Sequence, residues 1–131
     1  MMTIEEKVQH WLKMADRDVA SAEYNINGKF NLNGGYFCHQ AVEKALKARF
    51  VKLTDDTPPY THDLLKLAKL TELYEMMSDE QKGFIKRLDP LQIRARYQEY
   101  KDHIEKELTD EASQEILTET KEMLSWIKSK M

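Results

Sequence analysis

Apolar residues recur every three or four positions along the first 26 residues, and this spacing constrains the fold more than any other feature of the sequence. The spacing places them on one face of an amphipathic α-helix. Thr3 followed by Glu6 is a capping-box pattern, so we expect this helix to run from about Thr3 to Ile26. The apolar residues on this face are Val8, Trp11, Leu12, Ala15, Val19, Ala22 and Ile26.

The same spacing predicts further helices along the chain. Asn27-Gly28 and Asn33-Gly34-Gly35 predict a loop of about eight residues after the first helix. Pro58 and Pro59 predict a second loop at 54–61. Residues 91–106 again look helical after Pro90, with a weaker apolar stripe. The other expected helices are Tyr36–Leu53, Asp63–Met77, Asp79–Leu88 with Ser78 as N-cap, and Glu111–Lys128 with Asp110 as N-cap.

Residues that favour tight turns are scarce. The 131-residue chain has only four glycines and three prolines, which disfavours an all-β fold. Short connections between helices are typical of bundles. We therefore expect an all-α fold, an antiparallel up-and-down bundle of about five helices, in a single domain spanning residues 1–131.

Charge and cysteine content exclude several functions. The net charge of −3 predicts no overall attraction to nucleic acid or to an anionic membrane, and we expect no sequence-specific DNA binding. Cys38 is the only cysteine and lies on an apolar face, so we expect a buried, inert thiol. The four histidines lack metal-ligand spacing, and we expect neither a metal nor a cofactor. No secretory leader or 18-residue apolar run is present, which predicts a cytoplasmic protein without membrane spans.

Residues 82–101 form a basic stretch in an otherwise acidic chain. Six basic and two acidic residues give this stretch a net charge of +4, and Tyr97 and Tyr100 lie among the arginines. One interpretation is a surface that faces phosphate groups. The other is that these charges solvate a helix and pair with acidic neighbours. The basic residues are Lys82, Lys86, Arg87, Arg94, Arg96 and Lys101.

Arg96 and His103 are seven residues apart, so they share a face if the segment is helical. An imidazole can deprotonate a ribose 2′-hydroxyl, and a guanidinium can stabilise the charge that develops on the phosphate. This pair could therefore cleave RNA without a metal. The alternative is two exposed side chains paired with acidic neighbours such as Glu99 or Asp102.

Four segments carry motifs beyond helical spacing. The first helix contains Trp11-x3-Ala15-x2-Asp18-x3-Ala22, and Thr61-His62-Asp63-Leu64 follows the proline loop. Arg94-Ala95-Arg96-Tyr97 follows the fourth helix. The most specific segment is Tyr36-Phe37-Cys38-His39-Gln40-Ala41-Val42-Glu43-Lys44-Ala45-Leu46-Lys47-Ala48. Together these segments resemble the HEPN domain family along nearly the whole chain.

The resemblance implies a helical bundle that usually forms a homodimer. Family members are frequently encoded beside a minimal nucleotidyltransferase, and such pairs include toxin–antitoxin systems. Many active members are metal-independent ribonucleases with an R-x(4–6)-H motif that is completed across the dimer. Arg96 and His103, with six residues between them, match this motif at its longest spacing. Two features depart from active members: Tyr97 stands where they commonly have a polar residue, and R-x-R-Y is similar to the stand-alone branch, in which nuclease activity is often not evident.

Three functions follow from these observations. The first is a nucleotide- or phosphate-binding partner of a minimal nucleotidyltransferase, with Arg94, Arg96, Tyr97 and Lys101 contacting the phosphate. The second is a ribonuclease toxin that uses Arg96 and His103 as catalytic residues across a dimer interface. The third is a purely structural oligomerisation partner.

A polar stripe on the second helix has two interpretations. His39, Gln40, Glu43 and Lys44 either border a ligand groove or form a buried network. In the network, Glu43 or Gln40 would bond to Arg94, Trp11 or Tyr97, because a buried carboxylate needs a partner. We also expect Asp18 to pair with a basic residue and His62-Asp63 to form the N-terminal cap of the third helix.

Overall fold

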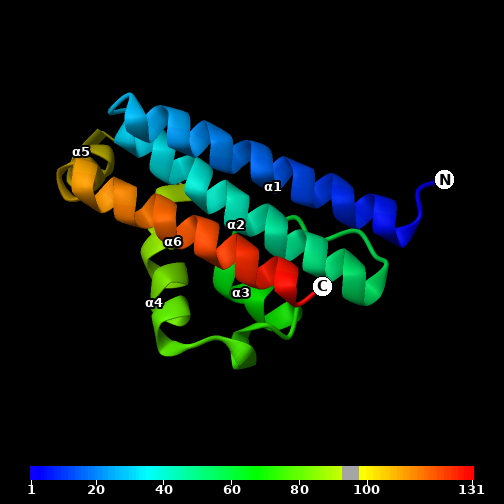
Figure 1. The fold of residues 1–131 in the computed structure, drawn as a ribbon. Helices are drawn as coiled ribbons and strands as arrows, with labels where there is room; N and C mark the ends of the chain where they lie inside the picture. Colours follow the sequence, from blue (N-terminus) through cyan, green and yellow to red (C-terminus); the bar gives the residue numbers. More distant parts are fainter. Residues whose placement is uncertain (93–97) are drawn as a thin grey trace.

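The computed structural model shows three long helices that run side by side, with shorter helices packed against them (Figure 1). It describes residues 1–92 and 98–131, with the side chains of residues 98–100 excepted. The expected all-α bundle is confirmed, although the described residues form six α-helices rather than about five. None of the described helices is both long and apolar enough to cross a bilayer. The elements are α1 (Ile4–Asn27), α2 (Asn31–Thr54), α3 (Leu64–Leu70), the 3₁₀ turn η1 (Tyr74–Met76), α4 (Asp79–Leu88), the 3₁₀ turn η2 (Asp89–Gln92), α5 (Gln98–Glu107) and α6 (Asp110–Ser129).

The three long helices differ in direction. α1 and α2 are antiparallel, whereas α6 runs alongside α2 in the same direction (Figure 1). At their N-terminal ends the Asn31 side chain donates to Asp110, at 2.8 Å. At their C-terminal ends Arg49 donates to the Lys130 carbonyl, at 2.7 Å. The short helices α3, α4 and α5 bring the chain back to the end of the bundle where α2 begins, which makes this direction possible.

α1 forms as its sequence predicts. The Thr3 side chain accepts from the Glu6 N–H and the Glu6 side chain accepts from the Thr3 N–H, so the capping box is present. Its buried residues fall at three- and four-residue intervals from Val8 to Ile26 and pack against α2. Exposed ion pairs between Lys52 and Glu5 and between Lys7 and Asp55 lie along the same contact. Such exposed pairs contribute little, so apolar burial holds the two helices together.

α2 begins at Asn31, five residues earlier than the expected Tyr36. The Asn33-Gly34-Gly35 sequence is helical, and its glycines allow close packing rather than forming a loop. A Cβ atom on Gly34 would lie 2.3 Å from Ile26 Cγ1, and one on Gly35 would lie 3.0 Å from Leu91 Cδ1. The connection from α1 to α2 is therefore short, and Lys29 within it adopts a left-handed conformation, with φ of 69°.

α2 is the central helix. It contacts every other α-helix of the described fold. Its buried residues include the apolar Leu46 and Val51 and also the polar His39, Glu43 and Lys47. The broad apolar face that the sequence predicts is present, and it explains how one helix packs against several neighbours.

α3 is shorter than expected. It ends at Leu70 rather than at Met77, because the chain turns through Glu72, which has φ of 64°, into η1. The expected caps are confirmed on both sides. Asp63 caps α3 by accepting from the Lys66 N–H, and Ser78 forms a capping box with Gln81 at the start of α4.

The last two helices include one correction. The N-cap of α6 is Thr109 and not the expected Asp110, because the Thr109 hydroxyl accepts from the Ala112 N–H. Asp110 is the first residue of the helix, where its charge also suits the helix dipole. α6 then buries Ile116, Leu124 and Ile127 within the bundle.

Candidate functional site

The structure describes two of the predicted phosphate-contacting and catalytic residues. Arg94, Arg96 and Tyr97 lie outside the described residues. Lys101 and His103 are described and belong to α5. They are two residues apart, which places them on different sides of a helix. They line two different clefts.

Lys101 lines a cleft at the N-terminus of α2, which we call the α2 cleft. It has a volume of about 450 Å³. Asn31 and Asn33 of α2 line it, together with the exposed ring of Phe30. Lys29 also lines the cleft, so two lysines from distant parts of the sequence, Lys29 and Lys101, meet there. The remaining lining residues are Leu32, Glu105 and Leu108.

The backbone at this cleft is suited to an anion. Phe30 is the N-cap residue of α2, and no side chain of the described residues caps the helix there. The first N–H groups of a helix have no partner within the helix, and the helix dipole gives this end a partial positive charge. A 24-residue helix therefore presents its first N–H groups, without a capping side chain among the described residues, beside two lysines.

Ion pairs hold the walls of the α2 cleft. Lys29 Nζ lies 2.8 Å from Asp110 Oδ2, and Asn31 donates to Asp110 Oδ1 and to the Leu108 carbonyl. The hydrogen bonds from Lys29 and Asn31 lower the pKa of Asp110 below its usual value. Lys101 Nζ lies 4.0 Å from Glu105, a looser contact that leaves the ammonium close to the cleft.

His103 lines a second cleft, of about 410 Å³, with Arg87 and Glu107 at its edge. Its side chain is 69% exposed, and Nε2 lies 3.4 Å from the Glu107 carboxylate. The expected pairing of His103 with an acidic neighbour is therefore present, with Glu107 as the partner among the described side chains. The side chain of Glu99 lies outside them. Asp102 makes contacts of its own.

The described basic residues of segment 82–101 do not gather at one place. Arg87 forms an ion pair with Glu119 of α6. Lys82 lies over the Tyr74 ring, with Nζ 4.6 Å from the ring centroid. Of the described members, Lys101 lines the α2 cleft. The interpretation as charges paired with acidic neighbours therefore describes Arg87, whereas Lys82 contacts an aromatic ring instead.

The polar stripe of α2 forms a buried network. Glu43 is the centre: its carboxylate lies 3.0 Å from Lys47 Nζ and 2.8 Å from His62 Nδ1. Lys47 Nζ also lies 5.8 Å from the centroid of the Trp11 ring. Glu43 is therefore part of a buried network as expected, but its described partners are Lys47, His62 and, at 3.9 Å, His39 Nδ1 rather than Trp11. The other expected partners, Arg94 and Tyr97, lie outside the described residues. Gln40, expected in the same network, instead donates to the Tyr36 hydroxyl.

His39 and Cys38 are buried and suited to packing rather than chemistry. Neither ring nitrogen of His39 has a hydrogen-bond partner at normal geometry among the described residues, although the His62 backbone lies beside the ring. Burial lowers the pKa of His39, and the nearby Glu43 carboxylate opposes this effect only in part. Burial raises the pKa of Cys38 to about 11, so the thiol is protonated and inert as predicted.

Other polar residues of the sequence analysis are also placed. Asp18 pairs with Lys44 at 2.5 Å, which confirms its expected basic partner. Within 1–92 and 98–131, no group of three or more His, Cys, Asp or Glu side chains is arranged to hold a metal ion.

The sequence did not indicate the α2 cleft. Lys29, Phe30 and Asn31 lie in a stretch that the glycines suggested was a loop. A usable signal was the absence of a Ser, Thr or Asp cap immediately before the helix, because a helix start without a capping side chain leaves N–H groups free.

The fold and the two clefts define an all-α bundle protein with an anion-suited helix end. The sequence profile of the HEPN domain matches residues 8–130, nearly the whole chain. The chain belongs to the HEPN domain family.

Its fold is similar to that of TT1696 from Thermus thermophilus, known from a crystal structure. The two share 22% sequence identity with a TM-score of 0.76, over 95% of this chain and 98% of that one. Among curated proteins, none matches the sequence significantly.

Proposed function

We propose that this protein binds a nucleotide or another phosphorylated ligand at the α2 cleft, as a homodimer that partners a minimal nucleotidyltransferase. One observation carries the proposal: Lys29 and Lys101 line a cleft beside the uncapped N-terminus of α2. Helix N-termini bind phosphate through free N–H groups and the helix dipole. Membership of the HEPN family supports the partner and the dimer.

The residues around the cleft suggest which parts of a nucleotide each of them would contact. The phosphates would lie against the α2 N–H groups, with Lys29 and Lys101 as counter-charges. The base would stack on Phe30, whose ring is 62% exposed at the cleft. Arg94, Arg96 and Tyr97 precede α5 in the sequence and remain part of the proposal as further phosphate contacts.

Calorimetry at low salt with ATP, GTP and inorganic triphosphate tests this proposal. We expect binding that weakens about tenfold in Lys101→Gln, because one charge-assisted contact is lost. Phe30→Ala should weaken the binding of ATP and GTP but leave the binding of triphosphate unchanged. Lys106→Gln is the matched control, because Lys106 is an exposed lysine of the same helix outside the cleft.

Two results would refute it. One is a folded protein that binds none of the three ligands. The other is an equal loss of affinity in Lys101→Gln and Lys106→Gln, which would indicate general charge attraction. Mixing with a nucleotidyltransferase encoded beside this chain, followed by sedimentation analysis, tests the partner and the dimer separately.

The exposure of His103 favours a second candidate, a metal-independent ribonuclease that uses Arg96 and His103. A second subunit could reach the imidazole, and Glu107 would hold the ring in place. Wild-type protein would then cleave RNA in the presence of EDTA, whereas His103→Ala would not and His10→Ala would. RNA that stays intact with the wild type, alone and without its partner, would exclude this activity.

A further inference from the structure

Two clefts follow one another along the seam between α4 and α6, and we call them together the α4–α6 groove. The larger one is the cleft that His103 lines, and its floor is mainly apolar, with Leu91, Ile104 and Ile116. The smaller one, of about 110 Å³, lies between Phe84 of α4 and Met123 of α6. The smaller cleft lies between α4 and α6, whereas the larger one lies between α6 and the η2–α5 segment, with Arg87 at the end of α4 between them. Figure 1 shows α4 beside α6.

One ion pair links the two clefts. Arg87 lines the larger cleft, Glu119 lines the smaller one, and the two side chains are bonded to each other. The α6 wall is regular, because its lining residues recur every three or four positions from Ala112 to Met123. That stretch is roughly 16 Å long, about three helical turns. Its length matches a helix of similar size lying along it.

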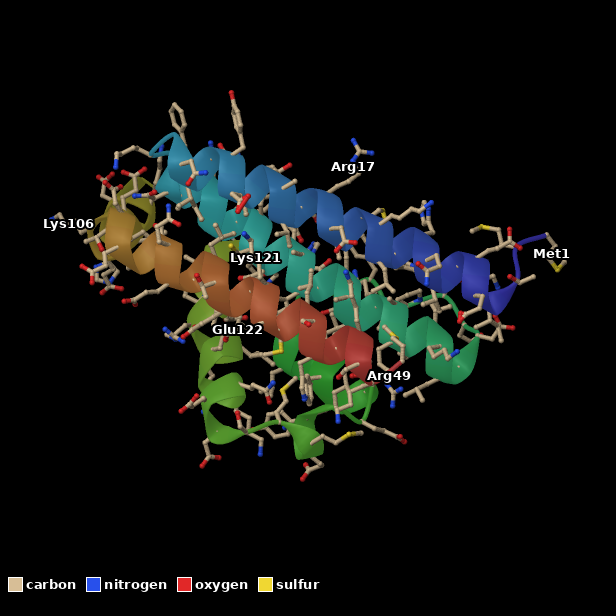
Figure 2. All side chains as sticks on the ribbon, in the orientation of Figure 1. Met1, Arg17, Arg49, Lys106, Lys121 and Glu122 are labelled. Carbon is tan, nitrogen blue, oxygen red and sulfur yellow. The ribbon has the colours of Figure 1, made fainter. Side chains whose placement is uncertain are left out.

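The groove carries excess negative charge. Five carboxylates line it, against Arg87 and His103. Glu107 pairs with His103 and Glu119 pairs with Arg87. The other three carboxylates have no basic partner within 4.0 Å among the described residues, and they are Glu80, Glu115 and Glu122. Figure 2 labels Glu122 on α6, on the side of that helix next to α4.

Gly83 gives an independent indication of a close approach. A Cβ atom on it would meet no heavy atom within 4 Å among the described residues, whereas the other three glycines each have close neighbours. Glycine weakens the interior of a helix relative to alanine, so an open glycine is not explained by the fold itself. Gly83 lies three residues after Glu80 and four before Arg87, which makes it a surface neighbour of both. Gly83 lines neither cleft itself, but its bare backbone beside Glu80 and Arg87 leaves room for another helix to come close.

We propose that the α4–α6 groove binds a basic amphipathic helix of a partner protein, about three turns long. Apolar residues on one face of that helix would fill the floor at Leu91, Ile104 and Ile116. Its Lys or Arg side chains would pair with Glu115 and Glu122. The carboxylates that attract such a helix repel phosphate groups, so this site is distinct from the α2 cleft and does not depend on nucleotide binding there. The groove shares His103 with the second candidate function, and a helix bound in it would exclude RNA from that side chain.

A synthetic probe tests the proposal on the full chain. The probe is a fluorescent peptide in which leucines follow helical spacing on one face and lysines occupy the other. Its control is the same composition in scrambled order, which keeps the charge but has no apolar face. We expect the amphipathic peptide to bind about tenfold more tightly than the scrambled one in fluorescence anisotropy. NMR shift changes should be confined to α4, η2, α5 and α6.

Two variants and a matched control locate the site. The double variant Glu115→Gln with Glu122→Gln should weaken binding of the peptide about tenfold, since two charge pairs are lost. Asp56→Asn with Glu75→Gln changes the net charge equally at exposed sites outside the groove and should leave affinity unchanged. Gly83→Leu should also weaken binding of the peptide about tenfold, because the leucine side chain would occupy the open space beside Glu80 and Arg87. The variant should melt no lower than the wild type, since leucine is a better helix former.

Several outcomes overturn the proposal. Equal binding of the scrambled peptide, or equal loss in the control variant, would show general charge attraction. Undiminished binding to Gly83→Leu, or shift changes on another face, would place the peptide elsewhere. A wild-type homodimer that dissociates in Glu115→Gln with Glu122→Gln would assign the groove to a second copy of this chain instead.

Discussion

The long helices and the short helices of this protein have different tasks. α1, α2 and α6 have 24, 24 and 20 residues, bury continuous faces against one another and include the buried charge network at Glu43. α3, α4 and α5 have seven to ten residues, and α4 and α5 border the larger clefts together with helix ends. The comparison shows that both sets of helices contribute to one apolar core, whereas the candidate binding surfaces lie where the short helices meet the long ones.

The largest expected effect concerns the network inside the long helices. Glu43→Ala leaves the Lys47 ammonium buried without its carboxylate, which should cost about 3–5 kcal/mol of unfolding free energy. Replacing both, as Glu43→Leu with Lys47→Met, should restore most of that loss. Urea unfolding measures both. An unfolding free energy of Glu43→Ala close to that of the wild type would show that the network does not stabilise the fold.

The contact between α1 and α2 gives the next largest effect. Gly34→Val places side-chain atoms against Ile26, where even a Cβ atom would lie at 2.3 Å. Overpacking of this kind costs about 1–3 kcal/mol. We therefore expect the melting temperature of Gly34→Val to be clearly lower than that of the wild type. An unchanged melting temperature would mean that α1 shifts without cost, contrary to a rigid scaffold of long helices.

A pH dependence should also come from the long helices. Burial lowers the pKa of His39, so the unfolded chain takes up a proton near pH 6.5 while the folded protein does not. The contribution of neutral His39 to the unfolding free energy is therefore fully present above about pH 6.5. It is lost as the pH drops below that value, by at most about 1.4 kcal/mol per pH unit. His39→Leu should remove this slope in denaturation series, and the exposed-site variant His10→Gln should keep it. A slope that persists in His39→Leu would show that His39 is not its source.

The smallest effect is expected in the short helices. Gly83→Ala on α4 meets open space and should raise the unfolding free energy by about 0.8 kcal/mol, because alanine is the better helix former. Changes in unfolding free energy of opposite sign for Gly34→Val and Gly83→Ala would sharpen the contrast between the long and the short helices. A destabilised Gly83→Ala would show that α4 is as closely packed as α2.

Periodic apolar residues predicted most of the fold. α1, α4 and α6 lie within one or two residues of their expected ranges because each has one clear buried face and a capping residue. The start of α2 was missed because glycine favours both a loop and a close helix contact, and only the position of Ile26 decides between them. α3 ended early because Glu72 adopts a left-handed conformation that its residue type does not predict.

The candidate sites were harder to predict than the fold. The sequence indicated Lys101 and His103 as functional residues, but not that they line separate clefts. The partners of Glu43 depended on where the 55–63 connection crosses α2, which brings His62 to within 2.8 Å. Such contacts join residues from separate elements, so helix periodicity alone carries no information about them.

The position of α2 has a consequence for how the chain is made. α2 ends at Thr54, and α6, which covers one of its faces, ends at Ser129. At synthesis rates of about 5–20 residues per second, the ribosome needs roughly 4 to 15 seconds to add the intervening segment. During that interval the α1–α2 hairpin is complete but its last apolar face is bare. Apolar surface exposed during that interval makes the nascent chain prone to aggregation until α6 is added.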